Sequence, residues 1–311
     1  MRCLVICDPI ERLNPTRDTT LPVMAQAIQR GAEAYWCEPH QLWLDQARLR
    51  AIGRRLVFDG ITPRSDGVEI DIDCHSLNWV FMRKDPPYDT GYHHAVLMLE
   101  HLRGQVLVVN DPDGLRRANE KLYTLQFSEW MPRSIVSASP GQIRSFMESV
   151  GGRAVIKPLS GYAGRDIFIL SLNDPNLQVI IESVTRYQTK PVMVQRYLPQ
   201  AADGDKRILL LDGKPIGAVL RIPKGAGEHR GNLRVGGKEM PTTLTVRERE
   251  LCQAIGPRLR KDGLYFVGID SIGDHLTEIN VTSPTGLQEI NRTSGLRLEE
   301  QVVDWIVANC R

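Results

Sequence analysis

The sequence predicts an α/β protein whose first part is an open, largely parallel sheet. From residue 3 to residue 110, short apolar runs typical of buried strands alternate with segments of helical spacing. This order favours parallel strands joined by helices, with ligands bound beyond the carboxyl ends of the strands. Later apolar runs flank Gly-containing turns and are typical of hairpins. With 311 residues, the chain has room for two or three structural units.

Composition narrows the class of function. The chain is 42% hydrophobic and 24% charged, has a formal net charge of +2, and contains neither a basic run nor an acidic tail. Nucleic acid and membrane surfaces are therefore not expected as partners. Six cysteines are scattered without a CxxC pair, which is typical of a reducing compartment. We find no signal-peptide pattern and no run approaching about 18 apolar residues, so we expect a cytoplasmic protein.

The first part opens with a predicted strand at residues 3–7, an apolar run that stops at Asp8-Pro9. Cap-type residues at 18–20 precede apolar side chains at helical spacing, and Gly31 ends this predicted helix. Further strands are predicted at residues 32–37, 54–58, 68–72, 77–82 and 106–110, with a helix at 92–102. Arg83 directly follows the strand at 77–82, so it should lie at the carboxyl end of the sheet.

The second part begins with a predicted helix from residue 111 to about residue 127, which carries Asn119, Glu120 and Lys121. Asp212-Gly213 is a turn signal that joins two apolar runs into a hairpin. A second turn signal, Gly273-Asp274, defines the last hairpin. The predicted strands are 132–136, 154–159, 167–170, 191–197, 205–211, 215–222, 265–269 and 276–281, and the remaining helices are 140–150 and 245–261.

The last hairpin carries two carboxylates and an amide on one face. Asp270 ends its first strand, while Glu278 and Asn280 are two residues apart in the second. Such a face is costly unless a cation joins it, and Mg²⁺ takes one or two carboxylates together with water and nucleotide phosphates. We expect a Mg²⁺ site here, with a solvated hairpin face as the alternative. Asp270 and Glu278 would face each other across a three-residue loop, Gly273-Asp274-His275.

A lysine inside a predicted strand indicates an anionic ligand. Lys157 lies in the run at 154–159, where an unpaired charge would be costly. Gly161 and Gly164 follow it and would let backbone N–H groups approach phosphate oxygens. No Gly-Lys-Ser/Thr motif is present, so the segment is not a P-loop, and an ordinary hairpin is the alternative.

A glycine- and arginine-rich loop spans residues 225–237 and reads GAGEHRGNLRVGG. It contains five glycines, together with Arg230 and Arg234, and has little apolar content. We expect a moving lid over an anionic ligand.

Several of these segments together resemble one family. They are MRKDPPYDT, NEKL, VIKPLSGYAG, GDKRILLLDG, RGN and FVGIDSIGDHLTEINVTSPT, and they are similar to prokaryotic glutathione synthetase, an ATP-grasp ligase, over essentially the whole chain. The resemblance implies an ATP-grasp fold of two α+β subdomains after the N-terminal α/β domain. The expected divisions are residues 1–120 for the N-terminal domain, 121–199 for the nucleotide-binding subdomain and 200–311 for the C-terminal subdomain with the metal and substrate site.

The resemblance also implies a reaction. γ-Glutamylcysteine and glycine would be joined to glutathione with ATP as co-substrate, through an acylphosphate, releasing ADP and phosphate. Two Mg²⁺ ions are expected at Asp270, Glu278 and Asn280, with Mn²⁺ as an alternative metal. The expected partners are these small-molecule substrates and further copies of the chain, in a homo-oligomeric dimer or tetramer.

Residues that match the family's motifs take their expected roles from it. The resemblance implies ATP-binding residues at Lys121, Lys157, Gly161, Gly164, Gln195, Tyr197, Leu198 and Asp205. It implies substrate-binding residues at Arg83, Arg207, Arg221, Arg230, Asn232, Ser283 and Thr285. Arg207 and Arg221, near the reacting carboxylate and phosphate, are also the expected catalytic residues.

One segment departs from the family's pattern. After Leu159, an acidic residue and a denser glycine cluster are expected, but the chain has Ser160-Gly161-Tyr162-Ala163-Gly164. We expect a stiffer loop, with Tyr162 over the phosphates. Two other functions stay open: another ATP-grasp carboxylate–amine ligase with a different acid or amine, and a non-catalytic nucleotide-binding regulator.

Overall fold

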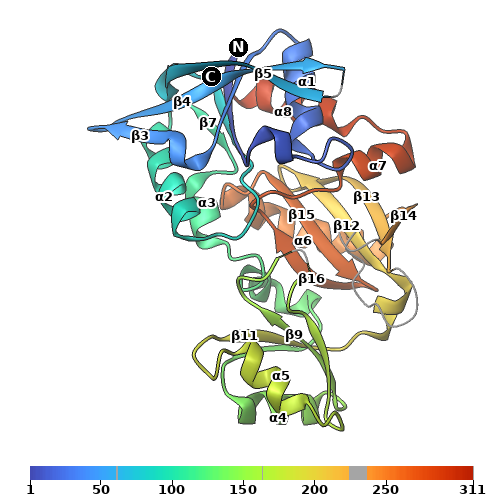
Figure 1. The fold of residues 1–311 in the computed structure, drawn as a ribbon. Helices are drawn as coiled ribbons and strands as arrows, with labels where there is room; N and C mark the ends of the chain where they lie inside the picture. The colour runs from blue at the N-terminus through green and yellow to red at the C-terminus, as the bar shows by residue number, and fades with distance from the viewer. Residues whose placement is uncertain (61, 163, 224–236, 311) are drawn as a thin grey trace.

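The computed structural model describes residues 1–60, 62–162, 164–223 and 237–310. Their strands form three sheets that follow one another along the chain, as Figure 1 shows. The first sheet has seven strands, the second four and the third five. Helices accompany each sheet, so the α/β class predicted from the sequence is confirmed.

Four neighbouring parallel strands form one side of the first sheet, as the alternation of strands and helices predicts. β1 (Arg2–Ile6) lies between β2 (Glu33–Cys37) and β6 (Trp79–Met82), and β7 (Leu107–Val109) pairs with β6. The connections β1 to β2 and β6 to β7 run through α1 (Thr20–Gln29) and α2 (Thr90–Leu99). The carboxyl ends of β1 and β6 therefore lead into the loops that carry Asp8 and Arg83.

The two short strands predicted at residues 54–58 and 68–72 are present, but each is part of a longer strand, and a third strand beside them was not predicted. Three antiparallel strands lie between residues 42 and 75: β3 (Leu42–Asp45), β4 (Arg48–Asp59) and β5 (Thr62–Asp73). The sequence does not reveal the full length of these strands, because charged residues occupy their exposed positions and form ion pairs between neighbouring strands. Arg50 and Asp71, for example, form an ion pair at 2.8 Å. Cross-strand pairs of opposite charge stabilise the antiparallel pair β4–β5, which we call the charged ribbon, without a clear apolar alternation.

The predicted helix from residue 111 to 127 is also wrong. α3 (Pro112–Arg117) ends early, and the 3₁₀ helix η5 (Tyr123–Trp130) begins after a break. Within the break, Asn119 Oδ1 accepts hydrogen bonds from the backbone N–H groups of Lys121 (3.1 Å) and Leu122 (3.0 Å). An asparagine that bonds its local backbone in this way competes with helical pairing. We call residues 118–122 the link, because they connect the first sheet to the second.

The second sheet is antiparallel and has a hydrophobic core of its own. Helices α4 (Pro140–Ser149) and α5 (Leu177–Val184) contribute Ile143 and Ile181 to this core. α5 was not predicted, since its 8 residues are too few for the helical period to be distinctive. The strand order is β10 (Phe168–Ser171), β9 (Arg153–Pro158), β11 (Val192–Arg196) and β8 (Ser134–Ser137).

The third sheet is antiparallel and contains both predicted hairpins. Its order is β14 (Lys238–Pro241), β13 (Lys214–Ile222), β12 (Asp205–Leu211), β15 (Phe266–Ile272) and β16 (His275–Asn280). α6 (Val246–Lys261) leads into β15, while α7 (Leu287–Ser294) and α8 (Leu298–Asn309) follow β16. Figure 1 shows α8, in red, beside the blue α1, and an ion pair between Arg30 and Asp304 joins these two helices.

The loop of the last hairpin differs from the prediction. Only Gly273 and Asp274 separate β15 from β16, because Ile272 already pairs with His275. A β-bulge nevertheless places Asp270 opposite Glu278, as predicted. Ser271 pairs with Leu276 and Asp270 with Glu278, so Thr277 is the extra residue. The three-residue loop is therefore wrong, but the cross-strand pair of carboxylates that it was meant to provide is present.

The first and third sheets share their hydrophobic cores. One cluster combines Ile6 of β1 with Ile269 of β15, and another combines Phe81 of β6 with Phe266 of β15. Asn110 adds a polar connection, since its Nδ2 donates to the carbonyl oxygens of Phe266 (2.9 Å) and Val281 (2.8 Å). These two sheets therefore form one packed body, whereas the core of the second sheet is separate.

Two predictions lie outside the described residues: the loop at 225–236 with Arg230 and Asn232, and Ala163 of the loop after β9. Among the helices that the structure describes, none combines the length and apolar character needed to cross a membrane.

Candidate active site

A cavity of about 670 Å³ lies between the second and third sheets. Strands β9, β10 and β11 supply one wall, and β12, β13, β15, β16 and the link supply the other. The lining includes every predicted site residue that the structure describes, with the exception of Arg83: Lys121, Lys157, Gly161, Gly164, Gln195, Tyr197, Leu198, Asp205, Arg207, Arg221, Asp270, Glu278, Asn280, Ser283 and Thr285. Residues that are far apart in the sequence therefore meet in one place.

Strand register explains why the charged residues meet. In the third sheet Arg207 pairs with Asp270, Asp270 with Glu278, and Asp205 with Arg221. Directly paired residues share a face of the sheet, and so do residues two apart in one strand. One face of the sheet thus presents two arginines, two aspartates, a glutamate and Asn280 to the cavity.

Asp270 is the centre of this face. Arg207 contacts it in a two-pronged pair, with Nε 2.6 Å from Oδ1 and Nη2 3.1 Å from Oδ2. Arg221 Nη2 lies 2.9 Å from Oδ1. Burial alone would raise the pKa of Asp270, but the two guanidinium groups hold it well below the ordinary value of an aspartate. Asp270 is therefore a fixed negative charge.

The two arginines are held from the opposite side as well. Arg221 donates from Nε and Nη2 to the Asp205 carboxylate at 2.7 and 2.8 Å. Burial lowers the pKa of Arg221, but Asp205 and Asp270 outweigh that effect and raise it. Arg207 Nη1 donates to the Thr285 carbonyl oxygen at 2.8 Å. Several partners thus set the orientation of both guanidinium groups.

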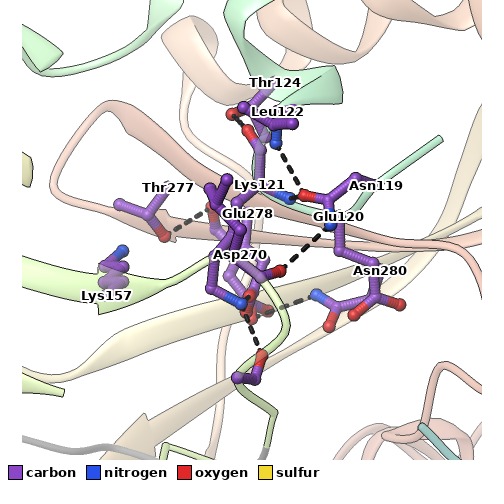
Figure 2. Close-up of polar contacts among 12 residues, drawn as sticks. Asn119, Glu120, Lys121, Leu122, Thr124, Lys157, Asp270, Thr277, Glu278 and Asn280 are labelled. Carbon is purple, nitrogen blue, oxygen red and sulfur yellow. Dashed lines mark hydrogen bonds and ion pairs between the residues drawn. The ribbon is translucent and has the colours of Figure 1, made fainter. Parts of the chain in front are cut away.

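Glu278 pairs with a lysine from the link. Lys121 Nζ lies 2.9 Å from Glu278 Oε1 and donates to the carbonyl oxygen of Gly161 at 2.6 Å (Figure 2). The Lys121 side chain is only 3% exposed, against 25% for Glu278. Burial lowers the pKa of Lys121, but Glu278 more than offsets this effect and the pKa is raised. Lys121 therefore brings a positive charge to the junction of the second and third sheets.

Lys157 lies across the cavity on the second sheet. Its Nζ donates to Gln195 Oε1 at 2.6 Å, and burial lowers its pKa. Next to it, Val155, Phe168 and Ile169 provide an apolar lining. An apolar end beside a lysine suits a planar ring attached to a charged group.

The donor set fits a hard divalent cation. Asp270 and Glu278 are cross-strand partners, and Asn280 Nδ2 lies 3.3 Å from Asp270 Oδ2 (Figure 2). Two carboxylates and an amide match the oxygen ligands that Mg²⁺ takes when phosphates and water complete its shell. Among the described residues, however, no cluster of three or more His, Cys, Asp or Glu side chains could hold a metal by protein ligands alone.

A second cavity of about 340 Å³ adjoins the first, with Asp85, Arg207, Arg221 and Thr285 in both linings. Its remaining polar lining was not predicted as a site: Arg12, Asn14, Arg17, Asp18 and Glu289. Glu289 is 2% exposed, burial raises its pKa, and its Oε2 has no hydrogen-bond partner among the described residues. A buried carboxylate oxygen beside a polar cavity is suited to a cationic group of a ligand.

Arg83 lies outside the linings of both cavities. It is 2% exposed, and its Nη2 donates to the Pro284 carbonyl oxygen at 2.9 Å. Its guanidinium group also packs against the rings of Phe81 and Phe266, at 5.2 and 5.7 Å from the ring centroids. The structure therefore shows Arg83 holding the segment that carries Ser283 and Thr285, and direct contact with substrate stays a prediction.

Sequence reasoning missed polar residues in loops and helices. Arg12, in the 3₁₀ helix η1 (Ile10–Arg12), and Arg17 lie in the connection that follows β1, and the rule that ligands bind beyond the carboxyl ends of parallel strands could have drawn attention to them. Glu289 lies in α7, where a glutamate is ordinary, so no signal distinguished it.

Family models account for nearly the whole chain. Residues 1–116 match the prokaryotic glutathione synthetase N-terminal domain, and residues 120–295 match the prokaryotic glutathione synthetase ATP-grasp domain. The boundary between the two matches falls in the link.

Relatives named glutathione synthetase match the chain over nearly its full length. The glutathione synthetase of Synechocystis sp. is 46% identical over 98% of this chain and 99% of its own. Those of Gloeobacter violaceus and Salmonella typhi are 45% and 40% identical, covering 100% and 98% of this chain and 98% and 97% of theirs.

Solved structures share the fold at low identity. D-cycloserine synthetase DcsG aligns with a TM-score of 0.66 at 14% identity, over 98% of this chain and 100% of its own. An ATP-grasp ligase from Chryseobacterium gregarium aligns with a TM-score of 0.66 at 14% identity, over 100% and 98%. Together with the family models and the full-length relatives, the fold and the site show that this chain belongs to the prokaryotic glutathione synthetase family of ATP-grasp ligases.

Proposed function

We propose that the protein joins γ-glutamylcysteine to glycine with ATP, forming glutathione, ADP and phosphate. One observation carries the proposal: lysines, arginines and carboxylates from the link and from the second and third sheets line a single cavity. The full-length relatives named glutathione synthetase support the choice of substrates.

The charges suit the two steps of such a ligation. In the first step, the γ-phosphoryl group of ATP passes to the cysteinyl carboxylate, and ADP leaves. In the second step, the glycine amine attacks the acylphosphate carbon, phosphate leaves, and the amine loses a proton. Phosphoryl transfer depends mainly on positioning and on neutralisation of charge. Lys121 and Lys157 would contact the nucleotide phosphates, while Arg207 and Arg221 would stabilise the reacting carboxylate and phosphoryl group.

Nucleotide recognition would use the second sheet. Val155, Phe168 and Ile169 would enclose the adenine, Gln195, Tyr197 and Leu198 would lie along its edge, and Asp205 would face the ribose. Gly161 and Gly164 lie in the turn after β9 and would admit the phosphates close to the backbone.

Asp270, Glu278 and Asn280 would hold Mg²⁺. The metal, when bound, would neutralise charge on the phosphates. We propose two ions, with Mn²⁺ as an alternative metal. Glu278 would exchange its ion pair with Lys121 for the metal as the nucleotide arrives, since both partners face the cavity.

The second cavity would seat the glutamyl end of the dipeptide. That end carries an ammonium group and a carboxylate. The Glu289 carboxylate would receive the ammonium group, and Arg12 and Arg17 the carboxylate. Ser283 and Thr285 would lie where the dipeptide passes between the two cavities, because Thr285 lines both.

Further expectations belong to the same proposal. Arg230 and Asn232 would act from a lid that excludes water from the acylphosphate, and Arg83 would contribute to the dipeptide site. We also propose a cytoplasmic homo-oligomer, a dimer or tetramer, with divisions at residues 1–120, 121–199 and 200–311. The six cysteines are free thiols, which suits a reducing compartment.

The test is ADP release with γ-glutamylcysteine as the acid while the amine is varied. The proposal expects turnover that requires both the dipeptide and Mg²⁺ and that is fastest with glycine. Faster turnover with another amine or acid would indicate a different carboxylate–amine ligase. Tight ATP binding without release of ADP for any combination of acid and amine would indicate a nucleotide-binding regulator.

A further inference from the structure

Glu120 has no role in the ligation proposed above, yet its carboxylate holds the end of β16. One oxygen, Oε1, accepts three hydrogen bonds: from the backbone N–H groups of Val281 (3.0 Å) and Thr282 (3.2 Å) and from Thr282 Oγ1 (2.8 Å). The backbone carbonyl of Glu120 accepts a fourth, from the N–H group of Ile279 at 3.1 Å. Glu120 thus continues the pairing of the third sheet beyond its edge strand.

The backbone that Glu120 holds leads directly into the substrate segment. Ser283, Pro284 and Thr285 follow Thr282 and line the large cavity. The Pro284 and Thr285 carbonyl oxygens are fixed by Arg83 and Arg207. Glu120 is therefore the anchor at the near end of a segment whose far end is held by arginines.

The two neighbours of Glu120 attach to the second sheet. Asn119 Nδ2 donates to the Leu159 carbonyl oxygen at 3.0 Å, and Lys121 Nζ donates to the Gly161 carbonyl oxygen at 2.6 Å. Leu159 and Gly161 lie just beyond β9, in the turn proposed to cradle the phosphates. Three consecutive residues therefore tie the phosphate turn to the acid-substrate segment.

A carboxylate at this position is costly, which argues against a purely local structural role. Burial raises the pKa of Glu120, and the nearby charge of Glu278 raises it further. A neutral amide would offer an oxygen acceptor without that cost. A charged acceptor holds three donors more firmly, because hydrogen bonds to an ionised group are stronger.

We infer that Glu120 is a positioning residue: it fixes the Val281–Thr282 backbone relative to Lys121 and so aligns the acid substrate with the nucleotide phosphates. The inference rests on the proposed ligation. The groups proposed to contact ATP and the dipeptide belong to other residues, so loss of Glu120 should leave both affinities nearly intact. Alignment of the reacting groups should suffer, and a displacement of about 1 Å can reduce turnover by about 100-fold.

The experiment compares Glu120→Ala and Glu120→Gln with the wild-type protein. For Glu120→Ala we expect kcat to fall by at least about 30-fold, while the Kd of Mg·ADP and the KM of the dipeptide change by less than about fivefold. Glu120→Gln keeps an oxygen acceptor and should recover at least about tenfold of the lost kcat. Wild-type protein that forms no glutathione would refute the proposed function itself, whereas the inference on Glu120 is judged only against an active wild type.

Glu248→Ala is the matched control. The Glu248 carboxylate also receives three donors, from Lys206 Nζ (2.6 Å), Ser271 Oγ (3.0 Å) and the Thr245 N–H group (2.8 Å). It lies outside the linings of both cavities. This variant should lower the melting temperature but leave kcat per folded molecule within about threefold of wild type.

Thr282→Val provides a second route if Glu120→Ala fails to fold. Thr282→Val removes one of the three donors and should lower kcat by about five- to tenfold. The double variant with Glu120→Gln should have the same kcat as the more severe of the two single variants. Additive losses would overturn the inference. So would a Glu120→Ala kcat within about threefold of wild type, or a loss confined to KM.

Discussion

At the scale of single residues, Asp270 decides how the arginines of the site are oriented. Its two oxygens receive Arg207, Arg221 and Asn280, and the Arg207 side chain also reaches Thr285. A charge so fully surrounded by donors orients its partners before any ligand arrives, which is what preorganised electrostatic catalysis requires. Glu278 differs, because its side chain is 25% exposed and, among the described residues, has an ion pair with Lys121 only. It is the carboxylate more open to a metal.

The first prediction concerns Glu278. Glu278→Gln should lower turnover by about 100-fold or more, because a charge that faces the metal and phosphates is lost while the amide oxygen can still accept a hydrogen bond from Lys121. The measurement is steady-state ADP release over a range of Mg²⁺ concentrations. Asp274→Asn, in the turn of the same hairpin, is the control for removal of one charge and should keep near-normal turnover. Near-normal turnover of Glu278→Gln at ordinary Mg²⁺ would remove its metal role.

The second prediction concerns the proton on Lys157. Burial lowers its pKa in the ligand-free protein, and a phosphate placed beside it would raise that pKa again. Nucleotide binding should therefore take up protons at a pH between the lowered pKa of Lys157 in the free protein and its higher pKa in the complex. Calorimetric titration with Mg·ADP in two buffers of different ionisation enthalpy measures this uptake. Lys157→Arg keeps the positive charge but does not titrate, so an unchanged uptake in that variant would assign the effect to another group.

Residues differ in how readily the sequence reveals them. Lys157 and Glu278 are charged residues within apolar strands, and a buried charge demands an explanation. Glu120 and Glu289 lie in a link and a helix, where charged residues are common, and only the fold gives them their partners. The loop residues Arg230 and Asn232 were predicted by resemblance and lie outside the described residues.

At the scale of elements, the bulge in the last hairpin determines which residues face the cavity. The two-residue turn Gly273-Asp274 is what the sequence signal indicates, but alone it would place Asp270 and Glu278 on opposite faces. Thr277, the extra residue, corrects the register, and its Oγ1 donates to the Asp270 carbonyl oxygen at 3.1 Å. Bulges have no strong sequence signature, so the chemistry of the hairpin could be predicted but its loop length could not.

The third prediction tests this register. A glycine inserted between Thr277 and Glu278 should take the place opposite Asp270, move Glu278 and Asn280 to the other face and abolish Mg²⁺-dependent ADP binding, because a shift of one residue reverses every following side chain. A glycine inserted between Gly273 and Asp274 changes only the turn and should retain binding. Titration calorimetry with ADP in the presence and absence of Mg²⁺ measures both variants. Equal binding by the two would show that the register beyond Thr277 does not set the face.

At the scale of the whole molecule, the site lies where two bodies meet. The first and third sheets share their cores, whereas Ile143, Ile156 and Ile181 belong to a core confined to the second sheet. The alternation of strands and helices was enough to predict the parallel strands of the first sheet, and turn signals predicted the hairpins of the third. The full length of the charged strands β4 and β5 and the break at Asn119 were missed, because cross-strand ion pairs and a local asparagine cap replace apolar periodicity there.

The last prediction follows from the separate core of the second sheet. A unit with a core of its own, joined to the rest by the link, by polar contacts and by the apolar contact of Met193, should open at a lower free energy than the shared core. We therefore expect two calorimetric transitions without ligand. Mg·ADP would bind between the sheets and only to their assembled form, so it should raise the lower transition selectively, by about 2.7 kcal/mol at a ligand concentration of 100 times Kd. Lys157→Met removes a ligand contact on the second sheet but none of its core, so it should keep both transitions and lose most of the shift. A single transition in the ligand-free protein, unchanged in shape when Mg·ADP is added, would show instead that all three sheets unfold as one unit.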